Sequence, residues 1–354
     1  MNDLSSLLFY ILSFVMSFFL YYLYNKHDKK ILLYLSFLIP MLIGGLRYYV
    51  GTDYGMYVEM YNYNSYVNLG FSIIKKISSY FGGVNALFFI YNFLTLLFVF
   101  LGLKNIDKKA RPIAYLCYLF VSYTYSFNII RQALAIAIVF YAYKYVINKD
   151  FKRWLIFILL AYVFHSTSLL FLPFYFLINT KSNKLRFLIV ILTMVLSYNY
   201  INIINYLSNT SLFNHYGLYA TEMNNTANNR MFFVDFLLLI YFLLNKKNIS
   251  KIDENSDIYI FLFSIGIALE LTGFFNPYVK RIAEYFLISR VYLLPQIPLS
   301  QKKAKNKLLH TILIFTYCLL IFVISVYILK QANIIPYRWL GGTLWKVKHH
   351  WYLW

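Results

Sequence analysis

Charged side chains are scarce in this chain of 354 residues, since Asp, Glu, Lys and Arg together make up 13% of it. A soluble domain carries about 25%. Hydrophobic residues instead reach 61%, and the mean hydropathy is +0.59. Apolar runs of about 20 residues recur along the chain, which is the length of helix that a hydrocarbon core about 30 Å thick requires. The composition therefore excludes a soluble globular protein and predicts an all-α, polytopic membrane protein.

Acidic residues and cysteines are also few, with 13 Asp and Glu against 33 Lys and Arg, and two Cys. Cys117 and Cys318 lie inside apolar runs and lack a spacing typical of metal ligands. The sequence has no P-loop and no G-x-S-x-G motif, so we expect neither a metal nor another cofactor. The net charge of +20 does not indicate a nucleic-acid partner, because membrane proteins place Lys and Arg in their cytoplasmic loops.

The apolar runs define the expected spans, and the first of them lacks the features of a cleaved signal peptide. They lie near residues 4–24, 31–49, 84–103, 112–128, 129–147, 154–178, 187–207, 231–245, 258–276, 282–299 and 308–330. Clusters of Lys and Arg separate them near residues 26–30, 104–111, 149–153, 181–186, 246–251 and 302–307. The positive-inside rule places all six clusters in the cytoplasm. If every run crossed the membrane, the clusters after residue 178 would fall on the opposite side, so one run does not cross.

The run 154–178 is the one that we expect not to cross. The polar residues 165–168 divide it into two halves, each too short to span a bilayer at 1.5 Å per residue, and Pro173 weakens a continuous helix. A re-entrant hairpin restores all six clusters to the cytoplasm. The alternative is that residues 154–178 form a single kinked span and that the topology departs from the simple alternation elsewhere in the chain. We therefore predict a transmembrane domain over residues 1–335, with about 10 transmembrane helices plus a re-entrant element, and an aromatic, basic tail over residues 336–354.

Ionisable residues outside the basic clusters gather toward the other side of the predicted membrane. The acids among them are Asp53, Glu59, Glu222, Asp235, Glu270 and Glu284, and the arginines include Arg47, Arg131, Arg230, Arg281 and Arg290. An ionisable group at membrane depth costs roughly 2.5–3.5 kcal/mol on insertion scales, so such residues usually mark a functional site or an ion pair. We therefore expect a site on the extracytoplasmic side, with Glu270 facing the interior of the bundle.

Two short segments suggest how such a site would bind an anion. In the first, Arg47 ends an apolar run, Gly51 supplies a flexible turn and Asp53 follows. Either Arg47 clamps an anion beside the carboxylate of Asp53, or the two residues only pair at the end of the helix. In the second, Arg131 lies at the start of a helix, whose free N–H groups favour phosphate. Alternatively, the side chain of Arg131 only extends to the membrane interface.

His165 and the pair Arg281 and Glu284 complete the set of candidates. His165 would bind a pyrophosphate oxygen or move a proton, or it is a hydrogen-bonded packing residue. Arg281 and Glu284 are three residues apart and so share one helix face, where they would act on a substrate or form a local ion pair. Tyrosines are abundant over residues 48–63, where their rings would stack on sugars.

Four motifs in this order give the chain a resemblance to a known family. They are Gly44-Gly45-Leu46-Arg47 with Gly51-Thr52-Asp53-Tyr54 and Tyr57, then Ile130-Arg131-Gln132-Ala133-Leu134-Ala135, then Phe164-His165-Ser166-Thr167-Ser168-Leu169, and finally Arg281 with Tyr285-Phe286. Each motif alone is weak, but together they cover most of the chain and resemble the EpsG/Wzy group of bacterial polysaccharide polymerases. The chain departs from this pattern after Pro336-Tyr337, because such proteins commonly end soon afterwards.

The resemblance implies a glycosyltransferase of the bacterial cytoplasmic (inner) membrane, with a GT-C-like fold and an active site facing outside. It would transfer a glycan, with inversion, from polyprenyl pyrophosphate onto a new lipid-linked repeat unit of an O-antigen, a capsule or an exopolysaccharide. The reaction would need no cofactor. Its partners would be the polyprenyl-pyrophosphate-linked oligosaccharide, the lipid bilayer and a regulator of chain length.

The resemblance also implies roles for the residues of the motifs. The substrate-binding set would be Arg47, Arg131, Arg281, Tyr54, Tyr57 and Tyr285. Its arginines would stabilise the pyrophosphate leaving group, and its tyrosines would contact the glycan. The catalytic set would be Asp53, His165 and Glu284, with Asp53 as the first choice for the general base and the other two as alternatives.

Two other classes of membrane protein remain open from the sequence. A flippase for lipid-linked oligosaccharides would show more spans and an internal repeat, and the sequence shows neither. A glycan ligase or a membrane acyltransferase would share the fold class and a catalytic histidine. Polymer formation from lipid-linked repeat units without another acceptor would separate a polymerase from a ligase.

Overall fold

The computed structural model describes residues 1–63, 68–178, 180, 182–208, 231–272 and 277–340. Within these ranges the chain is helical and has no β-strand, as the composition predicted. The elements, with η for 3₁₀ and π segments, are α1 (Asp3–His27), α2 (Lys30–Gly45), α3 (Tyr54–Tyr63), α4 (Leu69–Ser79), α5 (Val84–Leu103), α6 (Arg111–Cys117), η1 (Tyr118–Ser122), η2 (Tyr123–Phe127), α7 (Ile130–Ile147), α8 (Phe151–Phe164), η3 (Ser166–Phe171), α9 (Phe174–Ile178), α10 (Asn183–Tyr198), α11 (Tyr200–Ser208), α13 (Met231–Ile249), α14 (Ser256–Thr272), α15 (Pro277–Leu287), α16 (Arg290–Leu293), α17 (Gln296–Leu299), α18 (Ala304–Phe322), η5 (Val323–Ile328) and η6 (Gln331–Asn333).

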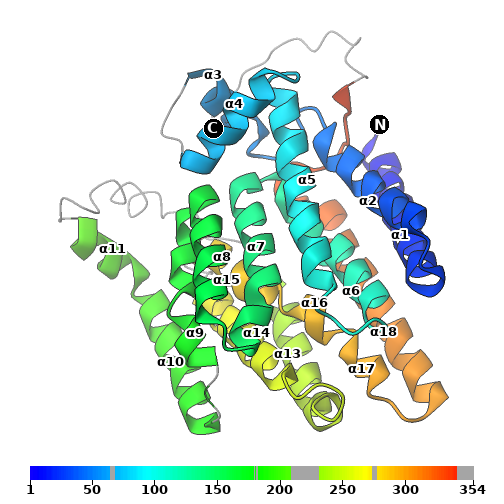
Figure 1. Ribbon diagram of the computed structural model, residues 1–354, viewed down its shortest axis with the longest axis vertical. Helices are drawn as coiled ribbons and strands as arrows, with labels where there is room; N and C mark the ends of the chain where they lie inside the picture. The colour runs from blue at the N-terminus through cyan, green and yellow to red at the C-terminus, as the bar shows by residue number, and fades with distance from the viewer. Residues whose placement is uncertain (64–67, 179, 181, 209–230, 273–276, 341–354) are drawn as a thin grey trace.

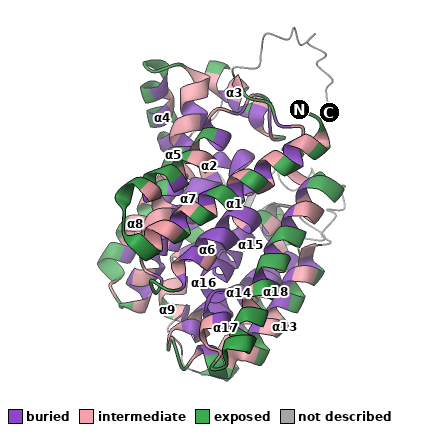
Figure 2. Cartoon of the chain, turned by 90° about the vertical axis from the view of Figure 1, so that its right-hand side faces the viewer, coloured by how far each residue is buried: buried purple, intermediate pink, exposed green. Residues whose placement is uncertain are grey.

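Four of the described helices are long and apolar enough to cross a membrane, namely α1, α5, α7 and α18 continued by η5. Helix α7 is buried on nearly every side, whereas α1 and α18 expose apolar residues such as Leu12 and Ile312 (Figure 2). Apolar side chains that stay exposed along a long helix are suited to lipid tails. The chain is therefore a helical membrane protein, while its ten crossings remain a prediction.

Four of the six regions that carry basic clusters contact one another in pairs. The side chain of Asn25, in the last turn of α1, donates to the carbonyl of Lys108 at 2.9 Å. Asp257, in the first turn of α14, pairs with Lys246 at 3.2 Å and with Arg186 at 4.0 Å. The connections α13–α14 and α17–α18 lie at the lower end of the bundle in Figure 1. These contacts join the first basic cluster with the second and the fourth with the fifth, which agrees with the common side that the positive-inside rule predicts for them.

The segment formed by α8, η3 and α9 folds back on itself. The ring of Phe151 at the start of α8 lies 5.0 Å from the ring of Tyr175 in α9, and the ring of Trp154 lies 5.9 Å from that of Phe171 in η3. The chain thus reverses at residues 165–168, the polar stretch that divides the apolar run. The depth of this hairpin in the membrane remains a prediction.

The C-terminal part of the described chain packs on the loop that follows α2. The N–H of Tyr48 donates to the carbonyl of Arg338 at 3.0 Å, and the side chain of Tyr337 is buried. The part of the expected tail that is described, residues 336–340, therefore packs against the helical body. The remainder, residues 341–354, lies outside the described residues.

Candidate active site

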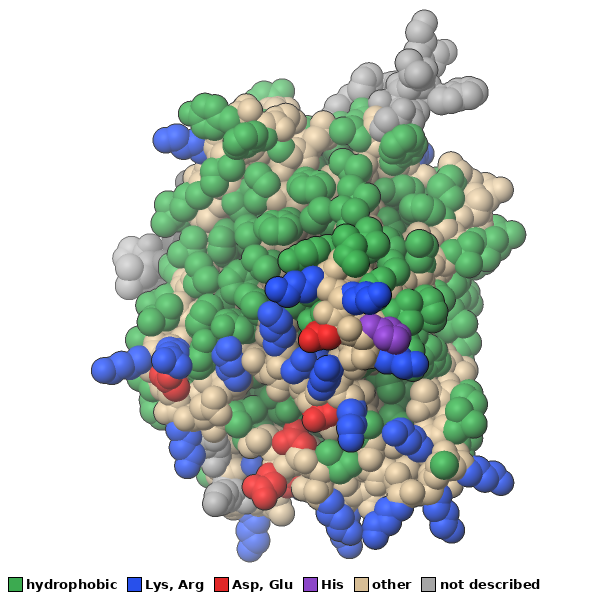
Figure 3. Space-filling view, turned by 45° about the vertical axis from the view of Figure 1, so that its right-hand side comes forward, with side chains coloured by type: hydrophobic (Ala, Val, Ile, Leu, Met, Phe, Trp, Pro, Cys, Tyr) green, Lys and Arg blue, Asp and Glu red, His purple; other side chains and the backbone are tan. Residues whose placement is uncertain are grey.

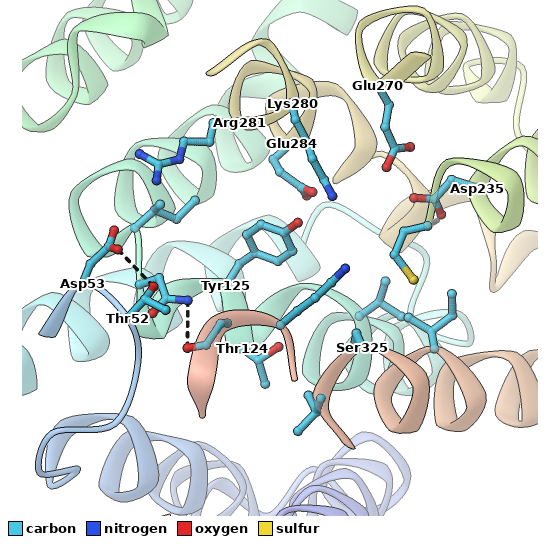
Figure 4. A pocket seen from close by; sticks show the side chains of 18 of the residues that line it. Thr52, Asp53, Thr124, Tyr125, Asp235, Glu270, Lys280, Arg281, Glu284 and Ser325 are labelled. Atoms are coloured by element: carbon cyan, nitrogen blue, oxygen red, sulfur yellow. Dashed lines mark hydrogen bonds between the residues drawn. The ribbon is translucent and has the colours of Figure 1, made fainter. Parts of the chain in front are cut away.

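A cavity of about 330 Å³ opens among segments that are far apart in the sequence (Figure 4). Its ionisable lining residues are Asp53, Asp235, Glu270, Lys280, Arg281, Glu284 and Arg290, and its neutral polar ones are Thr52, Thr124, Tyr125, Asn128, Ser325 and Gln331. Pockets that bind small ligands usually measure about 300–1,000 Å³. The cavity is therefore large enough for a small, polar ligand.

The cavity lies at the helix ends that are remote from the basic loops. Helix α7 begins at Ile130, next to the lining residue Ile129, and its other end leads to the basic loop before α8. Helix α13 begins at the lining residue Met231 and carries Lys246 and Lys247 in its last turn. Helices α3 and α4 lie at the upper end of the bundle, away from the basic loops (Figure 1). The positive-inside rule predicts that the end with the cavity faces outside.

Two stretches of irregular helix form part of the cavity wall. Helix α6 continues as the π segment η1 and then as the 3₁₀ segment η2, which together contribute Val121, Thr124 and Tyr125. Helix α18 continues as the π segment η5, which contributes Ser325 and Val326. Since π segments are rare and are frequent at functional sites, their presence on two sides of one cavity favours a functional role for it.

Asp53 and Arg281 lie at one end of the cavity (Figure 4), and Arg131 and His165 adjoin this end. Burial raises the pKa of Tyr57, and the charges of Arg131, Asp53 and Arg281 all act on its hydroxyl. Arg131 also lies over the ring of Tyr57, with its guanidinium carbon 5.9 Å from the ring centre. Figure 3 shows basic, acidic and histidine side chains gathered in the middle of one face, below a largely hydrophobic surface. The structure thus brings together candidates from all four motifs.

His165, at the turn of the hairpin, is held in its neutral form. Its Nδ1 lies 2.7 Å from the hydroxyl of Thr167, which donates to the hydroxyl of Tyr285 at 3.2 Å. Burial lowers the pKa of His165 to about 3, and the charges of Arg131 and Arg281 add to this effect. A base with so low a pKa is inefficient at neutral pH, and a neutral imidazole offers no positive charge to an anion. His165 thus lies beside the cavity as a buried side chain that is hydrogen-bonded to Thr167.

The other end of the cavity holds a buried cluster around Arg290. Nη1 of Arg290 donates to both carboxylate oxygens of Asp235, at 3.0 and 2.9 Å, and Nη2 lies 3.5 Å from Glu284. The hydroxyl of Tyr317 donates to Asp235 at 3.3 Å. Glu270 also lines the cavity and is 2% exposed, which confirms that it faces the interior. Because buried charges persist only when they are paired, this cluster is one interdependent unit.

Arg47 was expected to bind an anion, but in this structure its side chain is buried against backbone carbonyls, away from the cavity. Its side chain is 2% exposed and donates to the backbone carbonyls of Val50 at 3.2 Å, of Phe127 at 3.0 Å and of Gly44. The guanidinium carbon also lies 4.8 Å from the centre of the Phe88 ring. Each of the three guanidinium nitrogens thus donates to a backbone carbonyl, and Arg47 does not line the cavity, so it anchors the loop after α2 against η2.

The three tyrosines expected to contact a glycan are buried in the core. Tyr54 stacks on Phe88 with ring centres 4.3 Å apart, and the ring of Tyr285 lies 6.2 Å from that of Phe171. Tyr57 is 3% exposed, and the cavity lining includes none of the three. Aromatic rings contribute large apolar areas, so packing against other rings competes with any role at the surface. In this structure the three rings therefore pack in the core and do not line the cavity, and their contact with a glycan remains a prediction.

Lys280 and Tyr125 line the cavity although the sequence analysis did not single them out, and so do two residues that it named without giving them a role, Asp235 and Arg290. Asp235 and Arg290 lie in apolar runs, where an acid and an arginine are stable only as an ion pair. The cost of a charge at membrane depth would therefore have been enough to predict that these two residues pair. The sequence did not distinguish Lys280 from other lysines or Tyr125 from the other 36 tyrosines. Their part in the site depends on helix packing that the sequence pattern does not reveal.

The loop that carries Asp53 depends on Gly51, and we expect Gly51→Ala to lower the stability of the protein by about 1–3 kcal/mol. Gly51 has a φ of +103°, and an added Cβ would lie 2.7 Å from Oδ1 of Asn128 and 2.8 Å from the carbonyl oxygen of Phe127. Thermal unfolding of the purified variant measures the loss. The control is Gly55→Ala in α3, where an added Cβ meets nothing within 4 Å and no loss is expected. An equal loss in both variants would contradict this explanation.

The fold and the cavity together define a helical membrane protein in which arginines and carboxylates from distant segments converge at one end of the bundle. A sequence model of the EpsG family matches residues 30–339, and the chain belongs to this family. The match confirms the resemblance seen in the four motifs and places the chain among membrane proteins of polysaccharide biosynthesis. Comparisons with curated proteins and with solved structures gave no match.

Proposed function

We propose that this protein is a glycan repeat-unit polymerase. It would transfer the growing glycan from polyprenyl pyrophosphate to the terminal sugar of a new lipid-linked repeat unit, with inversion at the anomeric carbon. The observation that carries the proposal is the convergence of Asp53, Arg281 and Glu284, from motifs far apart in the chain, in one cavity. Membership of the EpsG family supports the same class of reaction.

The end of the cavity at Arg281 is suited to the pyrophosphate of the donor. Guanidinium groups bind phosphate oxygens in pairs of parallel hydrogen bonds, and Arg131 adds a second guanidinium beside the cavity. The N-terminus of the 18-residue helix α7 lies next to the lining residues Asn128 and Ile129, so its dipole adds to the positive potential. Positive groups held in place before the reaction stabilise the charge that develops on the leaving pyrophosphate.

The same positive groups would do the work that a divalent cation does in other phosphate chemistry. Among the described residues, no group of three or more His, Cys, Asp or Glu side chains is placed to hold a metal ion. The acidic cluster at the other end of the cavity is instead organised around Arg290. We therefore assign the neutralisation of the leaving group to Arg281 and Arg131.

The predicted topology supports a reaction on the outer face of the bacterial cytoplasmic membrane. Ten crossings, with the hairpin of α8, η3 and α9 as a re-entrant element, would put the basic loops in the cytoplasm. The cavity would then open toward the outside, where a lipid-linked repeat unit presents its sugars after transport. A GT-C-like architecture is part of this proposal.

The function is tested in cells that carry the gene and in cells that lack it. Cells without the protein are expected to hold lipid-linked glycan of one repeat unit only, and a plasmid copy of the wild-type gene should restore long chains. Glycan length is read by gel electrophoresis of cell extracts. Long chains that persist in the absence of the protein would contradict the proposal.

A further inference from the structure

We propose that Glu284 is the general base of the transfer and that the acidic end of the cavity, formed by Asp235 and Glu270, binds the acceptor sugar. The ligand of this end would be a hydroxyl-bearing sugar, the terminal residue of the incoming lipid-linked repeat unit. This inference rests on the proposed polymerase function. It adds to that function the end of the cavity at which each of the two substrates binds.

The positions of the two ends support an in-line arrangement. In an inverting displacement the attacking hydroxyl approaches the anomeric carbon from the side opposite the leaving group, so the base and the leaving group lie on opposite sides of the sugar. Asp53 and Arg281 lie at one end of the cavity and Asp235 and Glu270 at the other, with Glu284 between them (Figure 4). The base is therefore expected on the side of Glu284. Asp53 is less suited to this role because it lies at the end proposed for the pyrophosphate.

Contacts with two neighbouring side chains, Arg290 and Tyr125, hold Glu284 in place without using up its charge. The charge of Lys280 also acts on Glu284. Asp235 receives both short hydrogen bonds from Nη1 of Arg290, whereas the contact between Arg290 and Glu284 is 3.5 Å long. Tyr125, from η2, lies close enough to Glu284 to interact with it. Asp235 thus neutralises Arg290, Arg290 and Tyr125 orient Glu284, and the carboxylate of Glu284 stays available for a proton.

An incompletely paired donor on the same wall also points to a ligand. Nε of Arg290 has no hydrogen-bond partner among the residues that the structure describes, although the side chain is 3% exposed and lines the cavity. A buried donor without a partner is unfavourable, and an oxygen of a bound sugar would satisfy it. Sugar hydroxyls both donate and accept, so one sugar can serve this donor and the carboxylate oxygens of Glu270 and Asp235 together.

The proposed step keeps atoms and charge in balance. The acceptor hydroxyl gives its proton to Glu284 while its oxygen forms the new bond to the anomeric carbon of the donor. The bond from that carbon to the pyrophosphate oxygen breaks, and its electron pair leaves with polyprenyl pyrophosphate beside Arg281. Glu284 then returns its proton to solvent when the product leaves.

The experiment uses purified, full-length protein and the lipid-linked repeat units that accumulate in cells lacking it. Glu284→Gln is expected to lower kcat by at least about 100-fold with KM nearly unchanged, and to remove the acidic limb of the pH–rate profile. Asp53→Asn is the matched control, and its pH–rate profile should keep that limb. Glu284→Asp keeps the charge near Arg290 and is expected to recover part of the rate.

Each outcome of these measurements either supports or overturns the proposed role of Glu284. A Glu284→Gln variant that keeps the wild-type rate or its acidic limb would overturn the role of Glu284, and so would loss of that limb in Asp53→Asn. If Glu284→Gln does not fold, Glu284→Asp provides the test. Its carboxylate is one methylene group further from the substrate, so a normal kcat in this variant would contradict the role of Glu284 as the base. Wild-type protein that forms no polymer would contradict the proposed function itself, which the variants alone do not test.

Discussion

Arg281→Ala is expected to lower the rate of polymer formation by about 100- to 1,000-fold, the effect of removing one donor that stabilises a developing negative charge. The fold should persist, because α15 is anchored to α7 through its backbone. The side chain of Gln132 donates to the backbone carbonyl of Arg281 at 2.7 Å, and the substitution leaves this carbonyl in place. Polymer length and initial rate, measured with the purified variant, check the prediction.

Arg281→Lys is the matched control for this prediction. It keeps the positive charge but loses the paired hydrogen bonds of a guanidinium, so its rate should lie between those of the wild type and Arg281→Ala. A normal rate in Arg281→Ala, with unchanged thermal unfolding, would show that the pyrophosphate binds elsewhere.

Asp235→Asn is expected to lower the free energy of unfolding by about 3 kcal/mol, because it leaves Arg290 buried without its main partner. Both side chains are about 95% buried or more, and the two hydrogen bonds between them are 2.9 and 3.0 Å long. Glu284, at 3.5 Å from Arg290, offsets only part of the loss. Thermal unfolding in detergent measures the change.

The exposed ion pair between Asp3 and Lys330 provides the control for this second prediction. Its N–O distance is 3.0 Å, close to that of the buried pair, but the two side chains are 36% and 62% exposed. Asp3→Asn is therefore expected to change stability by less than about 1 kcal/mol. If both substitutions had the same small effect, the cluster around Arg290 would not be the stabilising unit that its burial implies.

The helical class and the hairpin could be predicted from the sequence because each depends on local composition. Apolar runs predict helices through their length alone, and the polar residues 165–168 interrupt one of them where the chain reverses. Asp53, Arg281 and Glu284 were accessible for a related reason. Ionisable side chains are rare in a membrane protein, so those that remain outside the basic loops tend to share a site.

The roles of Arg47 and of the tyrosines were not accessible, since these depend on tertiary contacts. An arginine that binds phosphate and one that binds backbone carbonyls can occupy the same motif, and only the contacts of Arg47 with Val50 and Phe127 distinguish them. Likewise, a tyrosine in an outer segment can face a sugar or another ring. Tyr54 faces Phe88, 34 residues away from it in the chain, which no local pattern predicts.

The most direct test of the central claim is polymer formation by the purified wild-type protein, supplied with lipid-linked repeat units and no other acceptor. The account predicts a ladder of products longer than one repeat unit, with release of polyprenyl pyrophosphate. A preparation of folded protein that leaves the repeat units single, or that lengthens them only when a different acceptor is added, would contradict it.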